Sequence, residues 1–115
     1  MTLSEVPSYP VSIFIAGDYD EARDACQAFC DEVGLCVTVT RTTYIYTDGE
    51  QEGVIVGLIN YPRFPAEPRE IWAKAEALGR KLREGLSQES FTIQAPDKTV
   101  WFSWRESTPS QALGR

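Results

Sequence analysis

The chain has 115 residues, with 11 Lys and Arg, 17 Asp and Glu and no histidine, so its formal net charge is −6. This length suits a single domain, residues 1–115, that folds without needing a metal or a disulfide. The lack of histidine excludes a Ser-His-Asp or Cys-His nucleophile, His-ligated zinc and an imidazole proton shuttle. The acidic balance argues against nucleic acid as a partner, because such binders need clustered Lys and Arg.

The cysteines and the first residues of the chain indicate the compartment. Residues 1–10 lack the features of a signal peptide, and no stretch holds the 18 or so apolar residues of a membrane span. Cys26, Cys30 and Cys36 are an odd number, which does not suggest a disulfide framework. They are either soft metal ligands or small buried side chains, and the second interpretation needs no further ligand. We expect a cytoplasmic protein with reduced thiols, no membrane association and no metal or other cofactor.

The first third of the chain predicts a strand and a helix. Ser12–Ala16 is a short apolar run that is typical of a strand. Asp18 and Glu21 have the spacing of a capping box, and apolar residues at helical spacing continue to Val33. Gly34 then suits the left-handed position after a helix. The cluster of Asp18, Asp20 and Glu21 is either a metal site or ordinary helix capping, and capping explains all three.

The middle of the chain predicts two paired strands. Leu35–Tyr46 is rich in β-branched residues; one face is mainly apolar but carries Arg41, and the other is a threonine ladder. Asp48-Gly49 marks a hairpin loop within residues 47–53. Val54–Tyr61 is apolar on both faces, which is typical of a central strand.

The remaining sequence predicts one more helix and a hairpin. A stiff loop with two prolines leads to Pro68, where a helix begins that runs to about Leu86. Ser90–Ala95 and Thr99–Arg105 read as two strands rich in aromatic residues. Residues 106–115 are polar without any period and predict a flexible tail, so the folded core spans about residues 11–105.

The order βαββαββ predicts an α+β fold. It matches a ferredoxin-like βαββαβ unit with an extra C-terminal strand, in which two helices cover one face of an antiparallel sheet. The other face then carries the threonine ladder together with apolar and aromatic residues. Such a face is too apolar to stay wet, so we expect a homo-oligomer through the open sheet face, or a ligand there.

Nine residues form the candidate ligand-binding site. Arg41 interrupts an apolar face and Arg63 lies in a stiff loop before a helix, so both suit a phosphate. Nearby rings can stack on a base, and nearby hydroxyl and amide groups can hydrogen-bond. The set is Arg41, Arg63, Tyr44, Tyr46, Tyr61, Phe64, Thr40, Thr42 and Asn60, and no catalytic residue is assigned. In the simpler interpretation Arg41 pairs with a structural carboxylate and the aromatic residues belong to the core.

Several segments are similar to proteins of one group. GLCVTVT at residues 34–40, TYIYT at 43–47, GLINYPRFP at 57–65 and PDKTVW at 96–101 carry the likeness. Over residues 12–104 the chain resembles short uncharacterised proteins of tailed phages and prophages. The resemblance implies a phage protein that acts in the cytoplasm of an infected host cell, and it brings no established activity.

Small phage proteins of this kind often counter host defence, some by sequestering cyclic-nucleotide signals of systems such as Thoeris and CBASS. The resemblance therefore implies an anti-defence protein. We expect a non-enzymatic protein that binds a nucleotide-like small molecule, such as a cyclic ADP-ribose or a cyclic dinucleotide. The alternatives are an acidic protein–protein inhibitor of a host defence factor, and a metal-dependent nucleotide phosphodiesterase that uses Asp18, Asp20 and Glu21.

Overall fold

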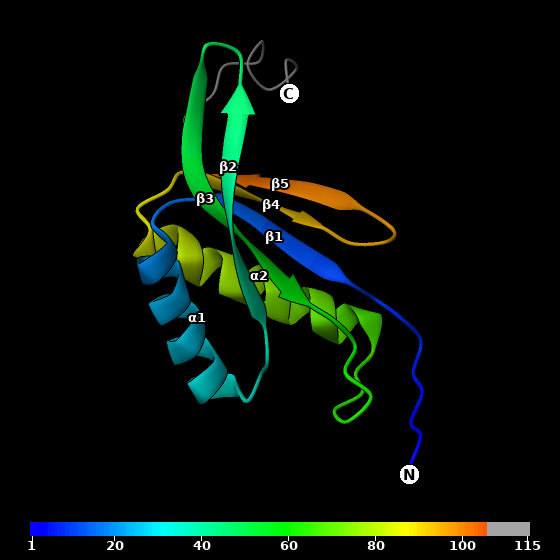
Figure 1. Ribbon diagram of the computed structural model, residues 1–115. Helices are drawn as coiled ribbons and strands as arrows, with labels where there is room; N and C mark the ends of the chain where they lie inside the picture. The colour runs from blue at the N-terminus through cyan, green and yellow to red at the C-terminus, as the bar shows by residue number, and fades with distance from the viewer. Residues whose placement is uncertain (106–115) are drawn as a thin grey trace.

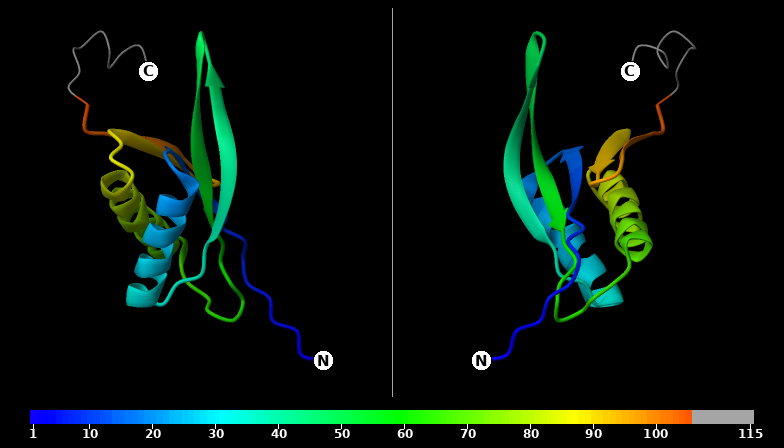
Figure 2. Two further views of the ribbon diagram at one scale, coloured as in Figure 1. Left: turned by 60° about the vertical axis from the view of Figure 1, so that its left-hand side comes forward. Right: turned by 90° about the vertical axis from the view of Figure 1, so that its right-hand side faces the viewer.

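The computed structural model describes residues 1–105 of the chain. Within this range the elements are β1 (Val11–Ala16), α1 (Tyr19–Val33), β2 (Thr38–Tyr46), β3 (Gly49–Leu58), α2 (Pro68–Gly85), β4 (Ser90–Gln94) and β5 (Thr99–Ser103). The strands form one antiparallel sheet in the order β2-β3-β1-β4-β5. Both helices lie on the same side of this sheet (Figures 1 and 2). The predicted α+β fold, with its ferredoxin-like order and added C-terminal strand, is confirmed.

The central strand β1 determines which residues face the helices. Val11, Ile13 and Ile15 are almost fully buried, whereas the residues between them are half-buried. This alternation is expected of a strand with one face on a core and the other open. The helices complete the core with Phe29 of α1 and Leu78 of α2, among other apolar side chains.

The helix ends lie where the sequence predicts them. Asp18 is the N-cap of α1, and its carboxylate accepts a hydrogen bond of 3.0 Å from the Glu21 backbone N–H. Gly34 ends the helix in the left-handed region, with φ of 71°. Pro68 begins α2, where a missing backbone N–H costs nothing. Neither helix in residues 1–105 is long and apolar enough to cross a membrane.

Several strand boundaries differ from the prediction, most of all those of the second and third strands. The third strand was expected at Val54–Tyr61 but runs from Gly49 to Leu58. Residues 49–53 look like a loop because they are polar, yet they pair in register with residues 42–46 of β2. The chain then leaves the sheet after Leu58, where Tyr61 and Phe64 close a turn of their own. The preceding strand was expected from Leu35 but begins at Thr38, because Gly34 and Leu35 still bond to Cys30 of the helix.

The strands β2 and β3 are longer than the rest of the sheet. β1 pairs with β3 only from Gly53 to Leu58, so residues 43–52 pair only with each other. This segment, the β2–β3 ribbon, projects from the body of the molecule (Figures 1 and 2). A two-stranded ribbon is marginally stable alone, so its direction depends on contacts at its base.

The β4–β5 hairpin forms the opposite edge of the sheet. Phe91 stacks on Phe102 with 4.8 Å between ring centroids, and Trp104 extends the stack. The guanidinium of Arg83 lies 4.0 Å from the centroid of the Trp104 ring and covers it. The strands end at Gln94 and Ser103, slightly before the predicted Ala95 and Arg105. The predicted flexible tail, residues 106–115, lies outside the described residues.

Two glycines of α2 provide a matched test of the core. A Cβ atom at Gly79 would lie 2.4 Å from Cε2 of the buried Phe91 ring, whereas one at Gly85 would meet Ala25 at an ordinary 3.8 Å. We expect Gly79→Ala to lower the free energy of unfolding by about 1–3 kcal/mol through overpacking. Gly85→Ala should leave it unchanged or raise it by up to about 1 kcal/mol, because alanine favours the helix. Chemical denaturation measures both, and equal effects would contradict this packing.

Candidate functional site

The structure divides the nine predicted site residues between two places. One group runs along β2: Thr40, Arg41, Thr42, Tyr44 and Tyr46. The other lies in the loop after β3: Asn60, Tyr61, Arg63 and Phe64. Arg41 pairs with Val54, and the stretch from there to Leu58 alone spans roughly 13 Å at about 3.3 Å per residue. The two groups therefore do not line one pocket within a single chain.

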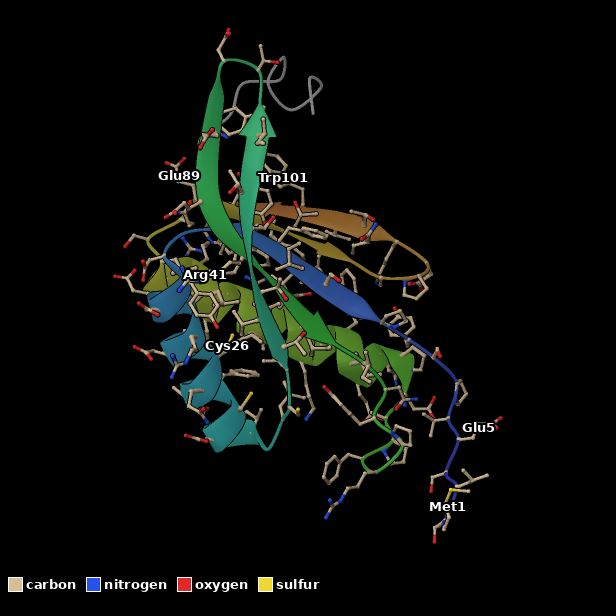
Figure 3. The ribbon with its side chains drawn as sticks, viewed as in Figure 1. Met1, Glu5, Cys26, Arg41, Glu89 and Trp101 are labelled. Carbon is tan, nitrogen blue, oxygen red and sulfur yellow. The ribbon has the colours of Figure 1, made fainter. Side chains whose placement is uncertain are left out.

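Arg41 rests on an aromatic ring. Its guanidinium carbon lies 4.3 Å from the centroid of Tyr19, the first residue of α1. Figure 3 shows Arg41 beside the start of this helix. The ion pairs within residues 1–105 are Arg80–Glu76 and Arg105–Glu89, so Arg41 pairs with no carboxylate there. Its nitrogen atoms stay available to an anionic group of a ligand.

A cleft of about 240 Å³ surrounds this cation, and we call it the Arg41 cleft. It lies between the start of α1 and the base of the β2–β3 ribbon. Its lining comprises Gly17, Asp18, Tyr19, Asp20, Arg41, Thr42, Thr43, Glu52 and Gly53. The cleft therefore combines one guanidinium with three carboxylates and one aromatic ring. This mixture suits a small molecule that carries charges of both signs.

The Tyr44 side chain is held by contacts with other residues of the sheet. Its hydroxyl donates a hydrogen bond of 2.6 Å to the carbonyl oxygen of Val54, and its ring lies against Gly53. Burial raises the pKa of this hydroxyl, and a hydrogen bond to the backbone of Ile15 opposes the shift. The ring lies beside the cleft rather than in its lining.

Thr40, Thr42 and Tyr46 share the open face of the sheet, as the alternation of β2 predicts. One row across this face contains Thr40, Ile55, Phe14, Thr92 and Trp101, in register from β2 to β5. Phe14 and Ile55 are half-buried although no helix covers this face. Tyr46 lies farther out on the ribbon and is exposed.

Asn60 has a structural role in the loop group. Its side-chain nitrogen donates to the Pro7 carbonyl at 2.9 Å, and its side-chain oxygen accepts from the Ala66 backbone N–H at 3.0 Å. One side chain thus ties the N-terminal segment to the loop that precedes α2. Both of its polar atoms already have partners within the chain.

Two other loop residues, Tyr61 and Phe64, border a mainly apolar pocket of about 240 Å³. Tyr61 and Phe64 contribute their rings, and Lys74 and Glu70 lie among the remaining lining residues. The guanidinium of Arg63 lies 5.6 Å from the centroid of the exposed Phe64 ring. A hydrogen bond with the Cys36 thiol, together with burial, raises the pKa of Tyr61.

The described residues hold no group of three His, Cys, Asp or Glu side chains placed for a metal ion. Asp18, which the phosphodiesterase alternative needs as a ligand, caps α1 instead. Cys26 is buried, Cys30 is half-buried and Cys36 is exposed, and all three are free thiols. Burial, with a smaller effect of Cys30, raises the pKa of Cys26 to about 11.

Comparison with known proteins gives two informative structural matches. No protein-family model matches the chain, and no curated protein matches it. A phage SAM lyase in the apo state aligns with a TM-score of 0.74 and 16% identity, covering 94% of this chain and 100% of the lyase. The chain shares the fold of a phage SAM lyase. A phage SAM lyase in complex with S-methyl-5'-thioadenosine aligns with a TM-score of 0.67 and 18% identity, covering 92% of this chain and 98% of the lyase.

These matches confirm some expectations and correct another. Both similar structures are phage proteins, which agrees with the phage resemblance of the sequence. One of them binds a nucleoside, which is consistent with the predicted binding of a nucleotide-like small molecule. The prediction that the chain is not an enzyme is contradicted, because the fold that it shares with SAM lyase over nearly its whole length belongs to an enzyme. The lack of histidine excludes only imidazole chemistry and leaves other routes of catalysis open.

Tyr19 and Glu52 are two functional side chains of the cleft that sequence reasoning missed. Tyr19 lies within the capping segment, and the predicted hairpin loop contains Glu52. The capping box did carry a usable signal, because it places Tyr19 at the first turn of a helix beside the sheet. Glu52 had no local signal, since its position follows from pairing with Thr43 across the ribbon.

The reactivity of the thiols provides a test of the burial of Cys26. At pH 8 a thiol with a pKa of about 11 is roughly one part in a thousand thiolate, so Cys26 should resist alkylation. We expect iodoacetamide to label exposed Cys36 first and to spare Cys26, as read by peptide mass spectrometry. Unfolding in urea should remove the difference, and rapid labelling of Cys26 in the folded protein would contradict its burial.

Proposed function

We propose that this protein is a lyase that cleaves S-adenosylmethionine (SAM) and releases S-methyl-5'-thioadenosine. The observation that carries the proposal is the fold shared with a phage SAM lyase along the whole length of that enzyme. The nucleoside bound in the second similar structure is a fragment of SAM, which supports the choice of substrate.

The charges of the Arg41 cleft suit SAM as a ligand. SAM carries a carboxylate, an ammonium group and a sulfonium group, so it has charges of both signs. Arg41 is placed to bind the substrate carboxylate, and Asp20 and Glu52 are carboxylates that attract the two cationic groups. Asp18 lines the same cleft but already accepts the capping hydrogen bond of α1.

The proposed reaction does not need histidine. When the bond between sulfur and the methionine γ-carbon breaks, both electrons stay on the sulfur, which leaves as a neutral thioether. No general acid is required to protonate that leaving group. As this bond breaks, the substrate's own carboxylate oxygen bonds to the γ-carbon and closes a lactone, or water accepts a proton from the β-carbon and a double bond forms between the β- and γ-carbons. The chain's contribution is to bind and orient the charged groups of the substrate.

The activity is tested with purified protein and SAM. We expect S-methyl-5'-thioadenosine to accumulate beyond the slow release seen without protein, as measured by chromatography with mass detection. The chromatographic retention of the amino-acid product distinguishes ring closure from proton loss.

Arg41→Gln should lower kcat/KM about tenfold or more, because it removes a charged hydrogen-bond donor to the substrate carboxylate.

Arg69→Gln is the matched control for this variant. Arg69 is an exposed arginine in the first turn of α2, outside the cleft. Its loss should leave turnover unchanged. Failure of the folded wild-type protein to form S-methyl-5'-thioadenosine would overturn the proposed activity, and equal turnover by the two variants would remove Arg41 from the site.

We also infer that a second copy of the chain covers the open sheet face. Half-buried Phe14 and Ile55 lie in the middle of that face, and Trp101 at its β5 end is 42% exposed. A second copy that packs on this face would remove its apolar side chains from water.

Light scattering on a size-exclusion column tests this association. We expect a mass that is a multiple of 12.9 kDa for the wild type. Ile55→Glu and the milder Thr40→Glu should both yield the monomer, because each places a charge on the open face. Ile45→Glu, on the other side of the ribbon, should not. A monomeric wild type at micromolar concentration would contradict the inference.

An anti-defence role in the cytoplasm of an infected cell stays a prediction. Cleavage of SAM would affect the host processes that consume SAM. This effect would not require the protein to bind Thoeris or CBASS signals. Infection of strains with and without those systems, using phage that carry or lack this protein, would test whether either system is the target.

A further inference from the structure

Tyr44 and Gly53 form a close contact at the base of the β2–β3 ribbon. A Cβ atom at Gly53 would lie 2.4 Å from Cε2 of the Tyr44 ring, 2.6 Å from the carbonyl oxygen of Ile15 and 2.9 Å from Cα of Ala16. No other residue at position 53 leaves room for the ring. With the ring in this position, the Tyr44 hydroxyl donates a hydrogen bond of 2.6 Å to the Val54 carbonyl oxygen.

This contact spans the point where the ribbon leaves the sheet. The pair of Ala16 with Gly53 is the last between β1 and β3, so Tyr44 belongs to the ribbon and Val54 to the body. The hydroxyl therefore links the projecting segment to the sheet across the junction. A two-stranded segment without such a link has little to hold its direction.

The same segment forms one wall of the Arg41 cleft. Thr43 and Glu52 of the ribbon, together with the adjoining Gly53, line the cleft opposite the first residues of α1. Any change in the angle of the ribbon moves Glu52 relative to Arg41. Building on the proposed function, we infer that Tyr44 is a positioning residue, whose hydrogen bond to Val54 holds the ribbon where the cleft can bind SAM.

Tyr46 offers a matched comparison on the same strand face. Its ring also lies against a glycine, since a Cβ atom at Gly49 would lie 2.6 Å from the Tyr46 Cε1. Tyr46 is 55% exposed near the tip of the ribbon, and its hydroxyl forms no hydrogen bond with residues 1–105. The two tyrosines thus differ in whether the hydroxyl links the ribbon to the body.

The first experiment measures the motion of the ribbon by hydrogen–deuterium exchange. Tyr44→Phe keeps the ring over Gly53 and removes only the hydroxyl. We expect it to raise the exchange rates of amides in residues 43–52 about three- to tenfold, the effect of losing one hydrogen bond. Tyr46→Phe should leave them unchanged. Unchanged exchange in Tyr44→Phe would overturn the inference, whatever the enzymatic activity.

The second experiment separates positioning from general stability. We expect Tyr44→Phe to raise KM for SAM, and Kd for S-methyl-5'-thioadenosine, about three- to tenfold while kcat stays within about twofold. A purely structural role would instead reduce the folded fraction, lowering apparent kcat with KM unchanged, and that result would overturn positioning. If the wild type does not cleave SAM, the proposed function fails. The nucleoside Kd and the exchange rates then still decide whether Tyr44 positions the cleft.

Discussion

The arrangement of the whole molecule depends on the one-sided burial of β1. Val11, Ile13 and Ile15 pack against the helices. Because paired residues point to the same face of the sheet, the antiparallel pairing of the strands then fixes which residues of the other strands face the helices. Because Ile13 pairs with Val56, and Val56 pairs with Val39, the side of β2 that carries Arg41 faces the helices. The threonine ladder is directed to the open face for the same reason. A one-residue shift in any pairing would exchange these two surfaces.

Local signals predicted much of this fold. The Asp18 cap, the Gly34 stop and Pro68 each act within one turn of helix, so the sequence near them is sufficient. The start of β3 was mispredicted because residues 49–53 are polar and glycine-containing, which is also typical of loops. Their strand character comes from partners in β2 and from a turn with Asp48 at φ of 60°. The composition of the segment does not contain that information.

The candidate site was predictable only in part, for a similar reason. Arg41 was recognisable as a charged residue on an otherwise apolar strand face, and the structure places it in a cleft. Its separation from Arg63 follows from the length and direction of β3, which composition does not specify. Asn60 was chosen for its hydrogen-bonding groups, but the loop and the N-terminal segment use both of them. The missing histidine limits the kinds of proton transfer available, and it does not decide whether a chain is an enzyme.

The position of β1 also affects how the chain acquires its structure. β1 is synthesised before the other elements of this sheet, yet its partners are β3 and β4, and Ser12 pairs with Gln94 near the end of the described chain. Closing such long loops is entropically expensive and slows folding. β2 and β3 are neighbours in sequence and can pair early, as a hairpin. The edge of β1 that pairs with β4 must therefore stay unpaired until nearly the whole domain has been synthesised.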